Sequence, residues 1–195
     1  MRKTEVMAIR LRRPSTGELR ALVEAGRSDS LTYEPVGITR ASEVPVGYRR
    51  EQWTRQLGRG DRVFENAANA LKSWRVQTGA GLIVLADGPP SVDQVVAIAA
   101  PLPIGFIDVV CRVVAATDDP ECCSFAYGTL SVHPERGEES FAVMRGPDDE
   151  ITFEIVAVSR PKDVLARAFP PIARRLQRAA TGRYLDAMQA AAVGA

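Results

Sequence analysis

A series of short apolar segments, running from residue 81 to residue 159, constrains the fold of this chain more than any other feature. The clearest segment is Phe106–Ala116, in which every odd-numbered residue is apolar and the even-numbered ones include Asp108 and Arg112. This alternation is typical of a β-strand with one buried face. The turns between the segments are short, and parallel strands need far longer connections, so the series predicts an antiparallel meander.

The predicted strands are apolar and are separated by turns rich in glycine, proline and aspartate. Six of them follow one another: Gly81–Ala86, Gln94–Ala99, Phe106–Ala116, Cys122–Val132, Glu139–Met144 and Ile151–Ser159. Leu31–Thr39 is interpreted as one more strand, because Tyr33, Val36 and Ile38 are apolar positions within it. The sheet is therefore expected to contain about seven strands.

Residues 1–30 are expected to form an N-terminal extension that contains a short amphipathic helix. Ser15 and Glu18 have the spacing of a capping box, and apolar residues follow at helical intervals over Thr16–Ala25. Most such helices cover a core, so we expect this one to pack across the main body of the protein. A lid or a dimer contact is the alternative.

Two helical segments are expected between the first strand and the meander. Tyr48–Leu57 is interpreted as helical, and Gly58–Gly60 ends it. Asp61 then fits as the N-cap of a helix over Arg62–Arg75, whose apolar face includes Trp74.

The last part of the chain, from Lys162 onward, has the periodicity of a long amphipathic helix with a break at Pro170-Pro171. A meander cannot bury its inner face alone, and a long amphipathic helix packed across that face solves the problem. We therefore predict an α+β fold of the helix-grip type, a curved antiparallel sheet around a long C-terminal helix. It is expected to form a single domain over residues 31–190.

Composition narrows the classes of partner and cofactor. The 25 basic and 24 acidic side chains nearly cancel, which argues against a nucleic-acid binder. One histidine and three cysteines, with no Cys-x-x-Cys pair, disfavour a metal site, and no cofactor is predicted. An odd number of cysteines with no evident disulfide pairing fits the reducing cytoplasm. No apolar run reaches the roughly 18 residues that a membrane span needs.

His133, the sole histidine, is the candidate catalytic residue. It lies in a predicted turn and is followed by Glu135, Glu138 and Glu139, which could orient it as a general base. The alternative is a structural histidine that forms hydrogen bonds within the turn. No separate nucleophile motif supports catalysis, so the structural role is favoured.

Four residues are predicted to contact a ligand. Tyr127 and Thr129 flank Gly128 on a predicted strand, where they could point into a cavity and bind the polar end of a ligand. His133 and Trp74 complete the set. A tyrosine whose hydroxyl is satisfied within the core is the competing interpretation. Gly128 is expected to mark a bulge or a close backbone approach.

Several charged residues are interpreted as solvated. Asp108 and Arg112, with Glu154 on a later strand, are expected on the outer face of the sheet. The last helix carries a row of arginines, which we interpret as its solvated stripe rather than as a patch for phosphate or anionic lipid. This arginine stripe consists of Arg167, Arg174, Arg175, Arg178 and Arg183.

Four segments form a recognisable set: Leu57–Gly60, Phe64–Trp74, Phe125–Phe141 and Phe153–Pro161. They resemble a family called domain of unknown function nineteen-ninety, and the resemblance covers about Leu31 to Met188. The element order is similar to that of the START-like, or helix-grip, superfamily, which includes birch-pollen-allergen-like proteins and polyketide cyclases. The resemblance implies a cavity between sheet and long helix that accepts an apolar molecule. It implies no activity for particular residues.

Three functions are therefore considered. The leading hypothesis is a noncatalytic binder of a small hydrophobic or amphipathic molecule. The second is an enzyme of the cyclase, isomerase or hydrolase type that uses His133 with a glutamate or Tyr127. The third is an interaction protein with a filled core, acting through the N-terminal helix or the arginine stripe. The observation that discriminates the second hypothesis from the first is whether His133 faces the cavity or the solvent, whereas the third hypothesis predicts that no cavity exists.

Overall fold

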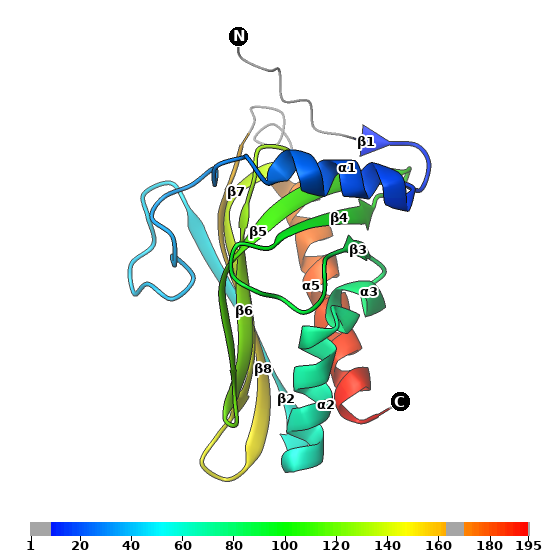
Figure 1. The fold of residues 1–195 in the computed structure, drawn as a ribbon. Coiled ribbons are helices and arrows are strands. Elements are labelled where there is room, and N and C mark those ends of the chain that lie inside the picture. Colours follow the sequence, from blue (N-terminus) through cyan, green and yellow to red (C-terminus); the bar gives the residue numbers. More distant parts are fainter. Residues whose placement is uncertain (1–8, 163–169, 195) are drawn as a thin grey trace.

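A curved antiparallel sheet packs against the C-terminal helix (Figure 1). The computed structural model describes residues 9–162 and 170–194, with the side chains of residues 170–179 outside the description. The strands are β1 (Ile9–Arg10), β2 (Arg49–Arg59), β3 (Ile83–Leu85), β4 (Val95–Pro101), β5 (Phe106–Asp119), β6 (Cys122–Thr129), β7 (Glu135–Arg145) and β8 (Glu150–Pro161). The helices are α1 (Thr16–Gly26), α2 (Asp61–Lys72), α3 (Arg75–Gly79) and α5 (Pro170–Ala192).

The six-strand meander is confirmed. β3 to β8 neighbour one another in sequence order, and each neighbouring pair is antiparallel. β2 forms the edge beside β8, and the short β1 pairs with β5. The predicted α+β class and helix-grip arrangement are therefore confirmed. α5 begins at Pro170, and the predicted helical residues 163–169 lie outside the described part of the chain.

Two predicted elements upstream of the meander are wrong. Leu31–Thr39 contains bends and turns instead of a strand, and Pro35 and Gly37 interrupt it. Tyr48–Leu57 is not helical, because most of it belongs to β2, which pairs along its length with β8. Hydrogen bonds to the open edge of β8 outweigh the weak local periodicity of this polar segment, and such non-local pairing is invisible in a short sequence window.

The concave face of the sheet carries the main core. Phe125, Phe141 and Phe153 lie on the adjacent strands β6, β7 and β8, and each is almost fully buried. Their ring centroids are 5.2 and 6.4 Å apart, and Tyr184 of α5 meets Phe141 edge-on at 5.5 Å. Ring pairs of this kind add about 0.5–1.5 kcal/mol each to the burial of their apolar area. The cluster thereby fixes α5 across the sheet.

The helix predicted over Arg62–Arg75 is confirmed as α2, with different ends. Its N-cap is Gly60, whose φ of 92° suits glycine, and Asp61 is the first helical residue rather than the cap. Asp61 lies at the positive end of the helix dipole and accepts a hydrogen bond of 2.9 Å from Arg145.

The convex face of the sheet is covered by the N-terminal part of the chain. α1 lies across β4 and β5 (Figure 1). Its apolar residues Leu19 and Val23 pack against Val95, Ala97 and Val110 of these strands. The packing role expected for this helix is therefore what the structure shows.

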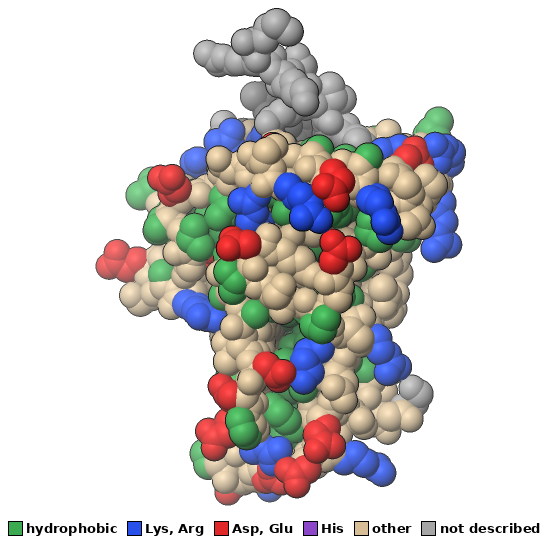
Figure 2. Space-filling view, in the orientation of Figure 1, with side chains coloured by type: hydrophobic (Ala, Val, Ile, Leu, Met, Phe, Trp, Pro, Cys, Tyr) green, Lys and Arg blue, Asp and Glu red, His purple; other side chains and the backbone are tan. Residues whose placement is uncertain are grey.

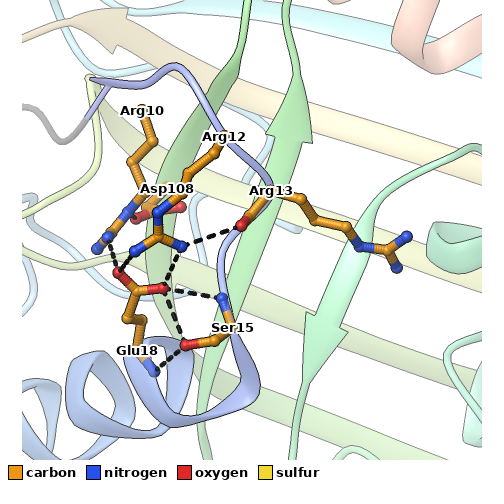
Figure 3. A network of polar contacts seen from close by, with 6 residues as sticks. All are labelled: Arg10, Arg12, Arg13, Ser15, Glu18 and Asp108. Atoms are coloured by element: carbon orange, nitrogen blue, oxygen red, sulfur yellow. Dashed lines mark hydrogen bonds and ion pairs between the residues drawn. The ribbon is translucent and has the colours of Figure 1, made fainter.

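The capping box of α1 is also confirmed. Ser15 Oγ accepts a hydrogen bond from the backbone N–H of Glu18, whose carboxylate accepts one from the backbone N–H of Ser15. The same carboxylate binds Arg10 and Arg12 at 2.6 and 2.7 Å (Figure 3). Arg12 and then Ser15 lower the pKa of Glu18 to about 2. Figure 2 shows that acidic and basic side chains are interspersed over the surface of α1.

Asp108 is fully buried, so the expectation of a solvated side chain is wrong. It lies on the outer face of β5, but α1 and β1 fold over this part of the face. Arg10 Nε donates to Asp108 Oδ2 at 2.5 Å (Figure 3). Arg112, on the same face, donates to the backbone carbonyls of Gly26 and Arg27 at the end of α1. Alternation in a strand cannot reveal that a distant segment covers its polar side.

Residues 31–48 cover another part of the convex face. Tyr33 and Ile38 pack against Val156 and Val158 of β8. Glu138 of β7 holds the segment in place, because its buried carboxylate accepts four hydrogen bonds from it. The segment that sequence alone suggests to be a strand is thus a partly buried cover of the sheet.

Candidate functional site

A cavity of about 360 Å³ lies between the concave face of the sheet and α5. Its described walls come from β4 to β8, from the turn after β6 and from residues of α5 that follow residue 179. This is the position at which the predicted helix-grip fold places a cavity. Its volume falls within the range of pockets that hold small molecules.

One wall of the cavity is apolar. Ile98 and Ala100 of β4 lie directly opposite Val109 and Ile107 of β5 in the antiparallel register, and all four side chains line the cavity. Cys111 continues this row on β5. It is buried, and burial raises the pKa of its thiol, so it contributes an apolar surface rather than a reactive thiolate.

Polar side chains gather at the other end, where β6 ends and β7 begins. Tyr127 of β6 and Glu139 of β7 are register partners, and the Tyr127 hydroxyl donates to Glu139 Oε2 at 2.7 Å. Both line the cavity, and Tyr184 of α5 lies beside them. Burial raises the pKa of Glu139 to about 7, a rise that the Tyr127 hydrogen bond opposes and that nearby Glu135 reinforces. A carboxyl group that is half-ionised near neutral pH therefore faces an apolar space.

His133 lies in the turn between β6 and β7 and lines the same cavity. Its Nδ1 accepts a hydrogen bond of 3.0 Å from the backbone N–H of Glu135, so the neutral ring carries its proton on Nε2. Burial is the main cause that lowers the pKa of His133 to about 4. Such a weak base is poorly matched to proton abstraction at neutral pH.

The three glutamates near His133 have separate roles. A backbone amide orients the histidine, and none of the hydrogen bonds described for His133 involves a carboxylate. Glu135 lines the cavity, and burial raises its pKa although Ser159 donates to its carboxyl group. The carboxylate of Glu138 binds the segment over the convex face, whereas that of Glu139 binds Tyr127 in the cavity.

The structure brings together three of the four residues predicted to contact a ligand. Tyr127, Thr129 and His133 all line the cavity. The Thr129 hydroxyl is already engaged, since it lies 2.6 Å from Thr32 Oγ1 and accepts from the backbone N–H of Gly137 at 3.0 Å. Its contribution to the cavity is therefore shape more than hydrogen bonding.

Trp74 is placed away from this group. It packs against Phe125 at a centroid distance of 5.0 Å, and its indole N–H donates to the carbonyl of Gly88 at 3.0 Å. It is not among the residues that line the cavity within the described chain. Gly128 does mark a close approach, because a Cβ there would lie 2.4 Å from the Tyr33 hydroxyl oxygen.

Two residues of the site were not singled out from the sequence as ligand contacts. Glu139 has the same strand parity as Phe141 and Val143, so their apolar alternation could have placed it on the inner face. Tyr184 lies four residues before Met188 on the buried side of α5, a spacing that also predicts an inward position. Of the arginine stripe, only Arg183 has a described side chain, and the side chains of the other four lie outside the description.

The raised pKa of Glu139 has a measurable consequence for stability. Its folded-state pKa of about 7 exceeds the ordinary value of 4.5, so its contribution is fully present below pH 4.5 and is lost as the pH rises through 7. We expect Glu139→Gln to gain about 1–3 kcal/mol relative to wild type between these two pH values. Urea unfolding at a series of pH values measures the difference.

A matched control is Glu154→Gln, because Glu154 lies on the outer face of β8, where it accepts a hydrogen bond from Gln52. Its stability difference from wild type should stay nearly constant over the same pH range. The effect of His133, whose lowered pKa removes stability as the pH falls from 6.5 to about 4, is common to all three proteins and cancels. Parallel curves for Glu139→Gln and wild type would contradict the prediction.

Comparison with known proteins agrees with the fold and the sequence motifs. Residues 32–187 match the profile of the family described as domain of unknown function (DUF1990). A UPF0548 protein of Deinococcus radiodurans is 25% identical over 185 residues, which cover 89% of this chain and 93% of that protein.

Two solved structures illustrate the shared architecture. The Zhui aromatase/cyclase from a Streptomyces species has a TM-score of 0.51 at 17% identity, covering 75% of this chain and 94% of its own. Ara h 8.0201 has a TM-score of 0.53 at 10% identity, covering 76% of this chain and 100% of its own. Identity this low shows a common fold and says nothing of chemistry.

The described helices include none that is long and apolar enough to cross a membrane. The family profile extends over most of the chain, from the cover of the convex face to α5, and it includes every described residue that lines the cavity. The chain therefore belongs to the DUF1990 family and has the helix-grip fold.

Proposed function

We propose that this protein binds a small hydrophobic or amphipathic molecule in the cavity between the sheet and α5. The observation that carries the proposal is the cavity itself, about 360 Å³ in volume, with an apolar wall on β4 and β5 and polar groups at the start of β7. Ligand sites of soluble proteins have this composition, mostly apolar with a few polar groups that fix orientation.

Two further properties bear on the class of partner and on the cellular location. The near-balance of 25 basic and 24 acidic residues does not favour nucleic acid as a partner. All three cysteines are free, which fits the reducing conditions of the cytoplasm, and we propose a cytoplasmic location.

An enzyme of the cyclase or isomerase type is the second candidate function, and one observation favours it. Glu139, with a pKa of about 7, is better suited than His133 to exchange a proton with a bound molecule at neutral pH. The resemblance in fold to an aromatase/cyclase is compatible with this alternative. A ligand recovered chemically unchanged after incubation with the protein would favour simple binding.

Native mass spectrometry of the protein purified from its own host tests the proposal, by comparison with the denatured mass. We expect a stoichiometric extra mass in the native protein. Ala180→Phe should remove that mass, because Ala180 lines the cavity from α5 and a phenyl ring would fill part of the space. Ala190→Phe is the matched control, since Ala190 is exposed on the same helix.

The two variants distinguish loss of the ligand from the cavity from a general loss of stability of the protein. If Ala180→Phe folds and still carries the extra mass at the wild-type ratio, the ligand does not occupy this cavity. If the wild-type protein carries no adduct and a neutral fluorescent dye such as aminoanthracene also fails to bind it, the proposal is wrong.

A further inference from the structure

We propose that the cavity selects an amphiphile whose head group donates a hydrogen bond, a hydroxyl or an amine, and that Glu139 accepts this bond. The inference rests on the proposed function, because it names the class of ligand for the same cavity. It also predicts that the cavity discriminates against ligands with a carboxylate head.

The first step is the state of the Glu139 carboxyl group. Tyr127 donates to Oε2, and no other hydrogen bond to this carboxyl group is described among residues 9–162 and 180–194. Glu139 lines the cavity and is only partly covered by protein. A ligand head placed in the cavity therefore meets an acceptor oxygen with spare capacity, held in position by the Tyr127 hydroxyl.

The second step concerns the hydrogen-bond partner that the carboxylate oxygen of Glu139 requires when a ligand displaces water. A wholly apolar ligand would displace water from Glu139 and leave a polar group without a partner, which is unfavourable in a dry site. A ligand that carries an O–H or N–H group replaces the lost water with a direct hydrogen bond. Glu139 therefore favours a donor at one end of an otherwise apolar molecule.

The third step is the charge around the cavity. The described lining contains Glu135, Glu138 and Glu139, and the carboxylate of Glu138 is bound to the segment over the convex face. The guanidinium group of the lining, on Arg183, belongs to an exposed residue of α5. His133 is held neutral by burial. Lys162 donates to a backbone carbonyl in the neighbouring turn and lies near enough to His133 to contribute to lowering its pKa, but it is not part of the described lining. A ligand carboxylate at the polar end would lie beside like charge, and the described lining offers no buried cation to compensate it.

Displacement of aminoanthracene by three ten-carbon probes, decanol, decylamine and decanoate, tests the inference. At about pH 8, above the pKa of Glu139, decanol and decylamine should each displace the dye at a concentration about tenfold lower than decanoate. Glu139→Gln keeps the size of the side chain and an acceptor for Tyr127 but removes the charge. It should reduce this preference by about tenfold, because the amide can donate to decanoate.

Glu154→Gln, on the outer face of β8, is the charge-matched control and should retain the wild-type preference. Equal displacement by decanoate and decanol in the wild-type protein would overturn the inference while leaving ligand binding intact. So would a preference that Glu139→Gln leaves unchanged. Failure of the dye to bind the wild-type protein would instead refute the proposed function, and this inference with it.

Discussion

Arg10→Met is expected to destabilise the fold by about 3–5 kcal/mol, the cost typical of removing one partner from a buried ion pair. Asp108 is fully buried, and Arg10 donates to one of its oxygens at 2.5 Å. Its other oxygen has no hydrogen-bond partner within the described chain. Without Arg10 a desolvated carboxylate would remain beneath α1 with no counter-ion. Urea unfolding measures the loss, and the methionine retains the apolar stem of the arginine.

Two variants isolate the buried charge as the cause. Arg12→Met removes an arginine from the same network, but the Arg12 side chain is 67% exposed, so the loss should be much smaller than that of Arg10→Met. The double variant Arg10→Met with Asp108→Leu removes both charges and should recover most of the stability, because the surroundings of Asp108 on β5 are apolar. Equal losses for Arg10→Met and Arg12→Met, or a double variant no better than the single one, would refute this account.

The Arg10–Asp108 ion pair shows why the strands could be predicted from the sequence while the burial of a charged side chain on one of them could not. The alternation in Phe106–Ala116 correctly identifies a strand, because the period of side-chain direction is a local property of the backbone. Whether Asp108 meets water depends on residues almost a hundred positions away in the sequence. The prediction of a helix over Tyr48–Leu57 failed for the same reason. Most of this segment belongs to β2, and its pairing with β8 is decided by an open sheet edge that a local sequence window does not contain.

The candidate site was predictable to a similar extent. Tyr127 and Thr129 lie in the cavity because they share strand parity with Phe125, a relation that the sequence contains. The partner of Tyr127 was not predictable, because it depends on the register that places Glu139 directly opposite. Trp74 shows the reverse case: its apolar helix face correctly indicates burial, yet burial in a filled core and contact with a cavity leave the same sequence pattern.

Glu138→Ala is expected to cost about 3–5 kcal/mol and to release residues 31–48 from the convex face. Glu138 is 3% exposed, and its carboxylate accepts from the Tyr33 hydroxyl at 2.7 Å and from the Gly37 amide at 2.8 Å. The amide and hydroxyl of Thr39 bind the same group at 3.3 and 2.5 Å. The substitution leaves four donors without their acceptor, and each one that stays buried carries a desolvation cost of about 1–3 kcal/mol. Urea unfolding measures the stability, and limited proteolysis measures access to the segment.

Tyr33→Phe and Glu154→Ala provide the graded controls. The first removes one of the four donors, so its cost should be only about 1–2 kcal/mol. The second removes a carboxylate whose described hydrogen bond is to the exposed Gln52 side chain, and its cost should stay below about 1 kcal/mol. A Glu138→Ala protein with wild-type stability and an uncleaved segment would mean that apolar packing of Tyr33 and Ile38 is sufficient. The predicted order of the three losses follows from the number of hydrogen bonds to the Glu138 carboxylate that each variant removes, and it would not arise if this cover were held by hydrophobic contact alone.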